Sequence, residues 1–138
     1  MKKEEQYNLI EGTDFVVLPY EQQRSILKEG IPVELMVNDL EHINNILQQA
    51  VENYNRNIKS LWEKEIDLKN YKRQYIGIIN KGGEKEVFVN CFYSRHIEDA
   101  PYWKNKLVFV CDGGNNFFDV KINLAKTIYY DFQTNGYA

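Results

Sequence analysis

Apolar residues recur every three to four positions over one long stretch of the chain. This is the period of a single helix face, and it is followed by Leu40, Ile43, Leu47, Ala50, Val51, Tyr54, Ile58 and Leu61. Asn38, with Glu41 three residues later, has the sequence of a capping box at a helix start. The sequence therefore predicts a long amphipathic helix over residues 38–60.

Beyond this helix the period of the apolar residues changes to two. The alternation and the richness in Val, Ile, Phe and Tyr are typical of half-buried strands, and they mark residues 71–79, 85–93, 106–111, 116–123 and 127–132. Short connections between consecutive strands favour an antiparallel meander. An amphipathic helix buries its apolar face against such a sheet. The expected fold class is α+β, with one long helix packed on a meander of four to five antiparallel strands.

The first 37 residues carry a weaker pattern, and their structure stays open. Residues 14–19 are typical of a short strand, and residues 20–30 could form about two helical turns before the chain is interrupted. With 138 residues, the chain has the length of one domain. We expect a single domain over residues 1–138, with its antiparallel sheet over residues 71–132.

The segment "CDGGNN" (residues 111–116) lies between two strand patterns. A phosphate-binding loop would follow a strand and open a helix, and a P-loop would also carry a lysine and a hydroxyl residue. This segment does neither. We interpret it as a tight turn in which Gly113 and Gly114 supply the positive φ angles.

A turn centred on Gly114 and a second centred on Ala125 fix a register for the last three strands. It pairs apolar residues on one face: Val108 with Val120, Val110 with Phe118, Val120 with Tyr130, Phe118 with Phe132, and Ile122 with Ile128. The opposite face would carry Leu107, Phe109, Cys111, Phe117, Asp119, Lys121, Tyr129 and Asp131. Because a soluble monomer rarely leaves a large apolar patch uncovered, we expect the N-terminal segment, a second subunit or a partner to cover it.

In this register Asp119 falls opposite Asp131. Like charges across a ladder are unfavourable, so the pair could be a carboxyl with a raised pKa or part of a cation site. The alternative is that Lys121 and water screen two exposed carboxylates. The sequence favours screening, because no histidine, arginine or third carboxylate converges on the pair.

The predicted loop over residues 94–105 has the most mixed chemistry. Tyrosine, tryptophan and arginine anchor many interfaces, and loops carry much of protein function. The alternative is that Tyr102 and Trp103 fold back onto the core. A Ser-His-Asp triad is not expected here, because neighbours on one loop rarely align for proton transfer. The candidate partner or ligand contacts are Arg95, His96, Tyr102, Trp103, Phe109, Phe117, Asp119, Tyr129 and Asp131.

Composition and charge exclude several classes of protein. Hydrophobic residues make up 43% of the chain and the formal net charge is −3, which argues against disorder and against a nucleic-acid groove. Cys91 and Cys111 fall in predicted strands, where we expect small buried hydrophobes. The spacing of histidines and cysteines indicates no metal site. We assign no catalytic residue, cofactor or metal ligand.

The N-terminus "MKKEEQYN" lacks the apolar stretch of a signal peptide, and no run is long enough to span a membrane. As written, the protein is expected in the cytoplasm. If an N-terminal signal had been removed, it would be exported or lipid-anchored.

The helix pattern is followed by "YIGIINKGGEKEVFVNCF" and "LVFVCDGGNNFFDVKINLAKTIYYDFQTNG". In this the chain resembles small uncharacterised α+β domain proteins of Bacteroides-type gut bacteria, over residues 71–136. The resemblance implies no activity and marks no catalytic position. The order of elements is also similar to cystatin-like and NTF2-like architectures, by analogy alone. Such folds host inhibitors, binding modules, immunity proteins and some enzymes.

The sequence favours a non-enzymatic binding domain whose partner is another protein, as for inhibitor, immunity or adaptor modules. One alternative is a small-ligand or hydrolase-like pocket between helix and sheet, using Asp119, Asp131 or His96. A second is a structural homodimer joined through the outer sheet face.

Overall fold

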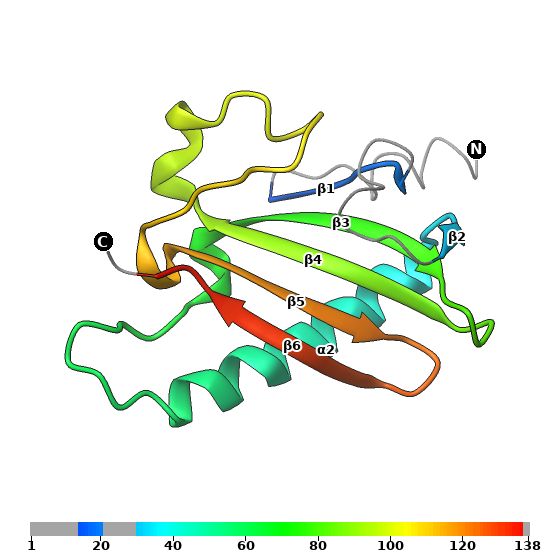
Figure 1. Cartoon of the computed structure of the whole chain (residues 1–138), viewed down its shortest axis with the longest axis horizontal. Helices are drawn as coiled ribbons and strands as arrows, with labels where there is room; N and C mark the ends of the chain where they lie inside the picture. Colours follow the sequence, from blue (N-terminus) through cyan, green and yellow to red (C-terminus); the bar gives the residue numbers. More distant parts are fainter. Residues whose placement is uncertain (1–13, 21–29, 137–138) are drawn as a thin grey trace.

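A computed structural model describes residues 14–20 and 30–136 of the chain. One long helix covers one face of a twisted sheet, and an irregular segment covers part of the other face (Figure 1). Most of the helix predicted over residues 20–30 lies outside the described residues. In chain order the helix and strands are β1 (Phe15–Val17), β2 (Ile31–Pro32), α2 (Val37–Arg56), β3 (Tyr71–Ile79), β4 (Lys85–Tyr93), β5 (Phe117–Asn123) and β6 (Ile128–Thr134).

The sheet has the strand order β1-β3-β4-β5-β6, and β2 pairs with β3 beside β1. All neighbours are antiparallel except β1, which runs parallel to β3. The α+β class with a mostly antiparallel sheet is therefore confirmed. The strands predicted over 71–79 and 85–93 are confirmed at both ends, and β5 and β6 lie within two residues of their predicted bounds.

The helix α2 differs from its prediction at both ends. Its N-cap is Met36, whose N–H donates to Asp39 Oδ2 at 2.8 Å, so the capping pair lies two residues before the expected one. The helix ends at Arg56, because the Asn57 side chain donates to the Asn53 carbonyl at 2.7 Å and closes the last turn. Leu61, expected on the helix stripe, lies beyond this end.

The apolar stripe of α2 packs on the inner face of the sheet. Its buried residues are Ile43, Ile46, Leu47, Ala50 and Val51. All of these except Ala50 share one core with residues of the strands and loops, including Leu35, Ile66, Leu68, Tyr71, Tyr75, Val87, Val89, Cys91, Phe118, Val120, Ile122 and Leu124. These side chains pack between helix and sheet, in the region where the alternative prediction placed a ligand pocket.

Residues 106–111 do not form a strand, which corrects the prediction. β4 pairs directly with β5, so Val120 lies opposite Val89 and Phe118 opposite Cys91. The predicted pairs of Val108 with Val120 and of Val110 with Phe118 are therefore wrong. Residues 94–113, here called the covering segment, instead pass over the outer face of the sheet (Figure 1).

Two amide side chains hold the covering segment on the sheet. Gln74 is fully buried; its Nε2 donates to the carbonyls of Trp103 (2.5 Å) and Lys106 (2.7 Å). Its Oε1 accepts from the Val108 N–H at 2.9 Å, and Asn90 Nδ2 donates to the Val108 carbonyl at 2.9 Å. These side chains satisfy backbone groups that would otherwise need a neighbouring strand. The segment therefore crosses above the sheet instead of joining it.

A second core lies between the covering segment and the outer face. Trp103 is 4% exposed and packs edge-on against Phe92, with the ring centroids 6.0 Å apart. The remaining members are Val16, Leu18, Tyr20, Ile76, Ile78, Phe88, Ala100, Leu107, Val108 and Phe117. Val16, Leu18 and Tyr20 of the N-terminal segment belong to this core, but β1 extends the sheet beside β3, and the covering segment is the part that lies over the outer face. The predicted apolar patch is not formed, because Leu107, Phe109 and Cys111 are not on a strand of the sheet.

The register of β6 differs from the prediction by one residue and then changes again. Ile122 lies opposite Tyr129 rather than Ile128, which places Tyr129 on the inner face. The pairing register between β5 and β6 shifts between Asp119 and Lys121. On β6 this irregularity lies at Asp131, whose φ is +53°. This bulge returns Phe132 to the inner face, where it stacks on Phe118 at 5.2 Å.

The segment "CDGGNN" makes a turn, but not the predicted hairpin. Gly113 and Gly114 have φ angles of +97° and +56°, as expected for glycine at such positions. They lead into the short 3₁₀ helix η4 (Gly114–Asn116) and then β5. Cys111 is exposed, contrary to the prediction, whereas Cys91 is buried as predicted.

Candidate functional site

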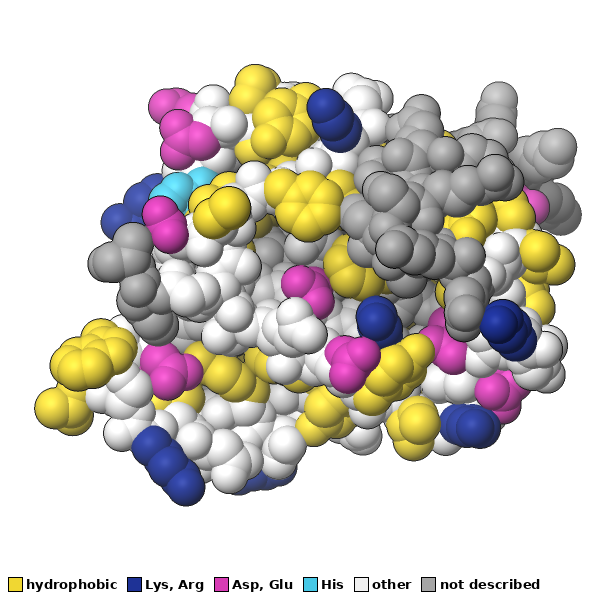
Figure 2. Space-filling view, in the orientation of Figure 1, with side chains coloured by type: hydrophobic (Ala, Val, Ile, Leu, Met, Phe, Trp, Pro, Cys, Tyr) yellow, Lys and Arg dark blue, Asp and Glu magenta, His cyan; other side chains and the backbone are white. Residues whose placement is uncertain are grey.

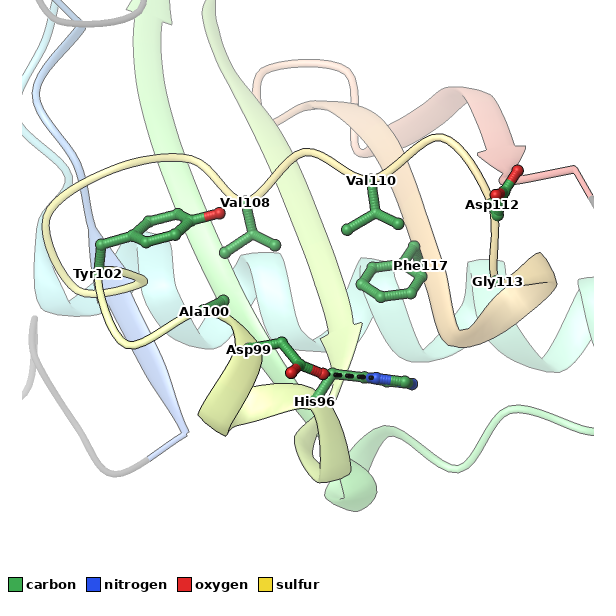
Figure 3. Close-up of a pocket in the computed structure, with 9 residues that line it drawn as sticks. All are labelled: His96, Asp99, Ala100, Tyr102, Val108, Val110, Asp112, Gly113 and Phe117. Atoms are coloured by element: carbon green, nitrogen blue, oxygen red, sulfur yellow. Dashed lines mark ion pairs between the residues drawn. The ribbon is translucent and has the colours of Figure 1, made fainter.

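A pocket of about 290 Å³ is formed by the covering segment together with the start of β5. It lies between the short 3₁₀ helix η3 (Ser94–Asp99) and residues 108–113, as Figure 3 shows. Its lining residues are His96, Asp99, Ala100, Tyr102, Val108, Val110, Asp112, Gly113 and Phe117.

The interior of the pocket is apolar. Val108 and Val110 point from one wall toward the ring of Phe117, which comes from β5 (Figure 3). The imidazole of His96 lies tilted beside that ring, with the centroids 5.1 Å apart. Such a pocket favours an aromatic or branched aliphatic group over a polar one.

The wall formed by residues 110–113 is held in place by β6 and the residues that follow it. Asn135 Nδ2 donates to the carbonyls of Val110 at 2.5 Å and Asp112 at 2.9 Å. Its backbone N–H donates to the Phe117 carbonyl at 3.0 Å. Gly113 lies so close to Phe117 that an added Cβ would be 2.6 Å from the ring. The pocket is therefore formed before any ligand binds.

The mouth of the pocket carries two carboxylates. Asp99 is 84% exposed and its Oδ2 lies 3.6 Å from His96 Nδ1. Asp112 is exposed at the other end, and no cation among the described residues forms an ion pair with it. A ligand with a positive charge beside an apolar group would match this arrangement.

Three of the predicted contact residues line the pocket together: His96, Tyr102 and Phe117. Trp103 is instead part of the outer core, which was the alternative considered for it. Arg95 lies outside the lining with its guanidinium 5.1 Å from the Tyr93 ring.

The predicted pair of Asp119 and Asp131 is not formed. Asp119 lies opposite Asn90 on one side and Gln133 on the other, while Asp131 pairs with Lys121 at 3.3 Å. Partial burial raises the pKa of Asp119 to about 6; Lys121 opposes this rise and Asp131 adds to it. Asp119 is a half-buried carboxyl outside the pocket.

Two further predicted contacts also lie away from the pocket. Tyr129 faces the helix, where its hydroxyl accepts a hydrogen bond from Asn53 Nδ2 at 2.8 Å. Phe109 is 69% exposed and does not contribute to the lining.

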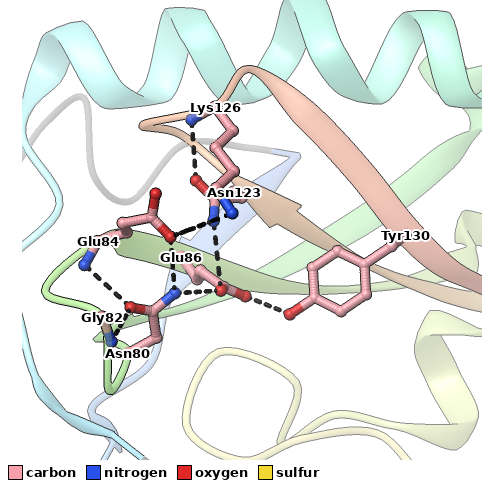
Figure 4. A network of polar contacts seen from close by, with 7 residues as sticks. All are labelled: Asn80, Gly82, Glu84, Glu86, Asn123, Lys126 and Tyr130. Atoms are coloured by element: carbon pink, nitrogen blue, oxygen red, sulfur yellow. Dashed lines mark hydrogen bonds and ion pairs between the residues drawn. The ribbon is translucent and has the colours of Figure 1, made fainter.

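A polar network closes the opposite end of the sheet (Figure 4). In the β3–β4 turn, Asn80 Oδ1 accepts from the N–H groups of Gly82 and Glu84, each at 2.9 Å. Asn123 Nδ2, on β5, donates to Glu84 at 3.2 Å and to Glu86 at 3.4 Å, and Tyr130 donates to Glu86 as well. The network ties two hairpins together, which is a structural role.

The pocket residues that sequence reasoning did not select are Asp99, Ala100, Val108, Val110, Asp112 and Gly113. Their convergence depends on the course of the covering segment. The outer-face residues of β3 and β4 are mostly apolar, but Gln74 on β3 and Asn90 on β4 are polar and lie directly opposite each other. Those two amides were the signal in the sequence that something polar, such as a crossing backbone, lies above the sheet.

Comparison with known proteins finds no matching family model, curated protein or solved structure. The resemblance to small domain proteins of gut bacteria therefore stays an expectation. In residues 14–20 and 30–136, no group of three or more His, Cys, Asp or Glu side chains could hold a metal ion. No helix in those ranges has the length and hydropathy to cross a bilayer.

Proposed function

We propose that this chain is a non-enzymatic binding domain whose pocket accepts an apolar side chain of a partner protein. The observation that carries the proposal is the preformed apolar pocket itself, whose walls are fixed by Gln74, Asn90 and Asn135. Its rim exposes more apolar surface, with Tyr102 at 40% and Val110 at 41%. A buried pocket that fits one anchor side chain is the usual centre of a protein interface.

The composition of the lining favours binding over covalent chemistry. Its nine described residues include no serine, threonine, cysteine or lysine, and the nucleophiles that remain are His96, Tyr102 and two carboxylates, for which the lining shows no activating base beyond the solvent-accessible His96–Asp99 pair. His96 and Asp99 lie at the rim, where solvent competes for them. One helix on an antiparallel sheet is also the arrangement of the cystatin-like proteins, which supports an inhibitor, immunity or adaptor module by analogy.

Selection from a random peptide display library tests this proposal directly. Against the wild-type protein we expect enriched peptides with an aromatic or large aliphatic anchor. Their affinity should fall at least about tenfold in Val110→Asp, because a charge is then placed against the apolar anchor.

Ile128→Asp is the matched control, since Ile128 is 46% exposed on β6 and lies outside the pocket. Peptide binding should be unchanged in this variant. Peptides that bind both variants and the wild type equally would show that the pocket is not the binding site.

A further inference from the structure

Two large apolar side chains project from the connection between α2 and β3. Leu61 is 98% exposed and Trp62 is 75% exposed; together they are here called the tip. Figure 2 shows hydrophobic side chains gathered over the covering segment and again on a projection at the side of the molecule. Exposed tryptophan is rare on protein surfaces and is enriched at binding hot spots.

The base of the tip is held firmly on the protein. Asn55 makes two hydrogen bonds to Ile66, accepting from its N–H at 2.8 Å and donating to its carbonyl at 2.9 Å. Asn115 Nδ2 donates to the Lys64 carbonyl at 2.6 Å. The Lys64 ammonium lies 3.8 Å from the centre of the Tyr93 ring. A fixed base presents the tip at a small entropic cost of binding.

The tip and the pocket lie at the same end of the molecule. Lys64, two residues after Trp62, donates to Asn116, which directly precedes the pocket floor residue Phe117. It also contacts Tyr93, the residue before η3. Figure 1 shows the connection after α2 at the same end of the sheet as η3 and the C-terminus.

The tip matches the pocket in size and in charge. The pocket volume of about 290 Å³ is near the lower bound for small-ligand sites, which suits an indole. Lys59 lies two residues before the tip and forms no ion pair among the described residues. The pocket mouth offers Asp99 and Asp112. An apolar anchor with a neighbouring cation is therefore present in this chain itself.

We propose that a second copy of this chain docks its Leu61–Trp62 tip into the pocket, with Lys59 beside the carboxylates of the mouth. The inference rests on the proposed function, because it names an occupant for the same pocket. Since tip and pocket lie at one end, two copies can exchange tips around a two-fold axis and form a closed pair.

Sedimentation velocity over a concentration series from micromolar to millimolar tests the exchange. The wild type should pass from monomer to dimer, while Trp62→Ala and Val110→Asp should each weaken dimerisation at least about tenfold. Mixing the two variants should give a heterodimer that is tighter than either homodimer but weaker than the wild-type dimer, because one of the two tip–pocket contacts is intact and the other is altered on both sides. Ile128→Asp, outside both surfaces, should dimerise as the wild type does.

Charge reversal provides a second arm that leaves the apolar contacts intact. Asp112→Lys should weaken dimerisation, and adding Lys59→Glu to it should restore part of the loss. Circular dichroism of each variant confirms that it is folded.

A wild type that stays monomeric throughout, or a Trp62→Ala variant that dimerises normally, would overturn the exchange. If display peptides still bind the pocket of such a monomer, the proposed function stands and only the second copy is rejected. If no peptide binds either, both proposals fail.

Discussion

Three amide side chains decide where the connection between β4 and β5 runs. Gln74 and Asn90 bind its backbone at residues 103–108, and Asn135 binds it at residues 110–112. Each replaces a hydrogen bond that backbone groups would make in a ladder. The pocket depends on these few residues, because they place Val108 and Val110 opposite Phe117.

Gln74→Met keeps the volume of the side chain and removes its polar atoms. Several buried groups then lose their partners, and we expect a loss of about 2–4 kcal/mol in the free energy of unfolding. The Val108 amide should also lose protection from hydrogen exchange. Gln48→Met, on the exposed side of α2, where Gln48 bonds Glu52, should change stability by less than about 0.5 kcal/mol. Equal protection of Val108 in wild type and Gln74→Met would contradict this role.

Asp119 should make stability depend on pH. Its pKa of about 6 in the folded protein exceeds the value of about 4 in an unfolded chain, so the native state binds the proton more tightly. Its contribution to stability is therefore present below about pH 4 and is lost as the pH rises through about 6. Asp119→Asn should stabilise the protein by about 1 kcal/mol at pH 7.5, after allowance for solvent screening.

At about pH 3.5 the same substitution should have little effect, because Asp119 is then mostly protonated in both the folded and the unfolded state. Urea unfolding of both proteins at the two pH values measures the difference, with the exposed Glu65→Gln as control. A gain of equal size at both pH values would show that protonation of Asp119 is not the cause.

At the scale of elements, the turn before β5 links backbone strain to the shape of the pocket. Gly113 has a φ of +97°, and a Cβ there would lie 2.6 Å from the Phe117 ring. Gly83, in the β3–β4 turn, has a φ of +81° with nothing within 4 Å of the added Cβ. The two glycines separate the cost of the backbone angle from the cost of the contact.

Gly83→Ala should cost about 1–2 kcal/mol of stability from the positive φ alone. Gly113→Ala should cost at least about 1 kcal/mol more, because the ring must move. In addition, Gly113→Ala alone should weaken peptide binding in the pocket. Thermal or urea unfolding and a binding titration measure the two effects. Equal losses in the two variants would mean that Phe117 has room to adjust.

The elements also show how far the sequence could predict the fold. β3 and β4 were predicted to the residue, because their alternation is regular and Asn80 and the glycines mark the turn. Residues 106–111 have the composition of a strand, so their own sequence did not predict that they cross above the sheet. Their position is determined by the side chains of Gln74 and Asn90 beneath them. The faces of β6 were not predictable, since one bulge at Asp131 reverses them within the strand.

At the scale of the whole molecule, the two faces of the sheet have different roles. The inner face is closed by α2. The outer face carries a cover formed by the chain itself, and the pocket lies within that cover. Three of the nine predicted contact residues meet there, because composition could identify a chemically mixed loop but not the segment that would fold against it.

The most direct test of the binding proposal is methyl NMR with N-acetyl-tryptophanamide as the probe. The account predicts saturable shifts of the Val108 and Val110 methyl groups, with the exposed Ile31 and Ile128 methyl groups unchanged. The Val110→Asp protein should show no saturable response. Shifts spread evenly over exposed methyl groups, or the same response in Val110→Asp, would contradict the assignment of this pocket as the binding site.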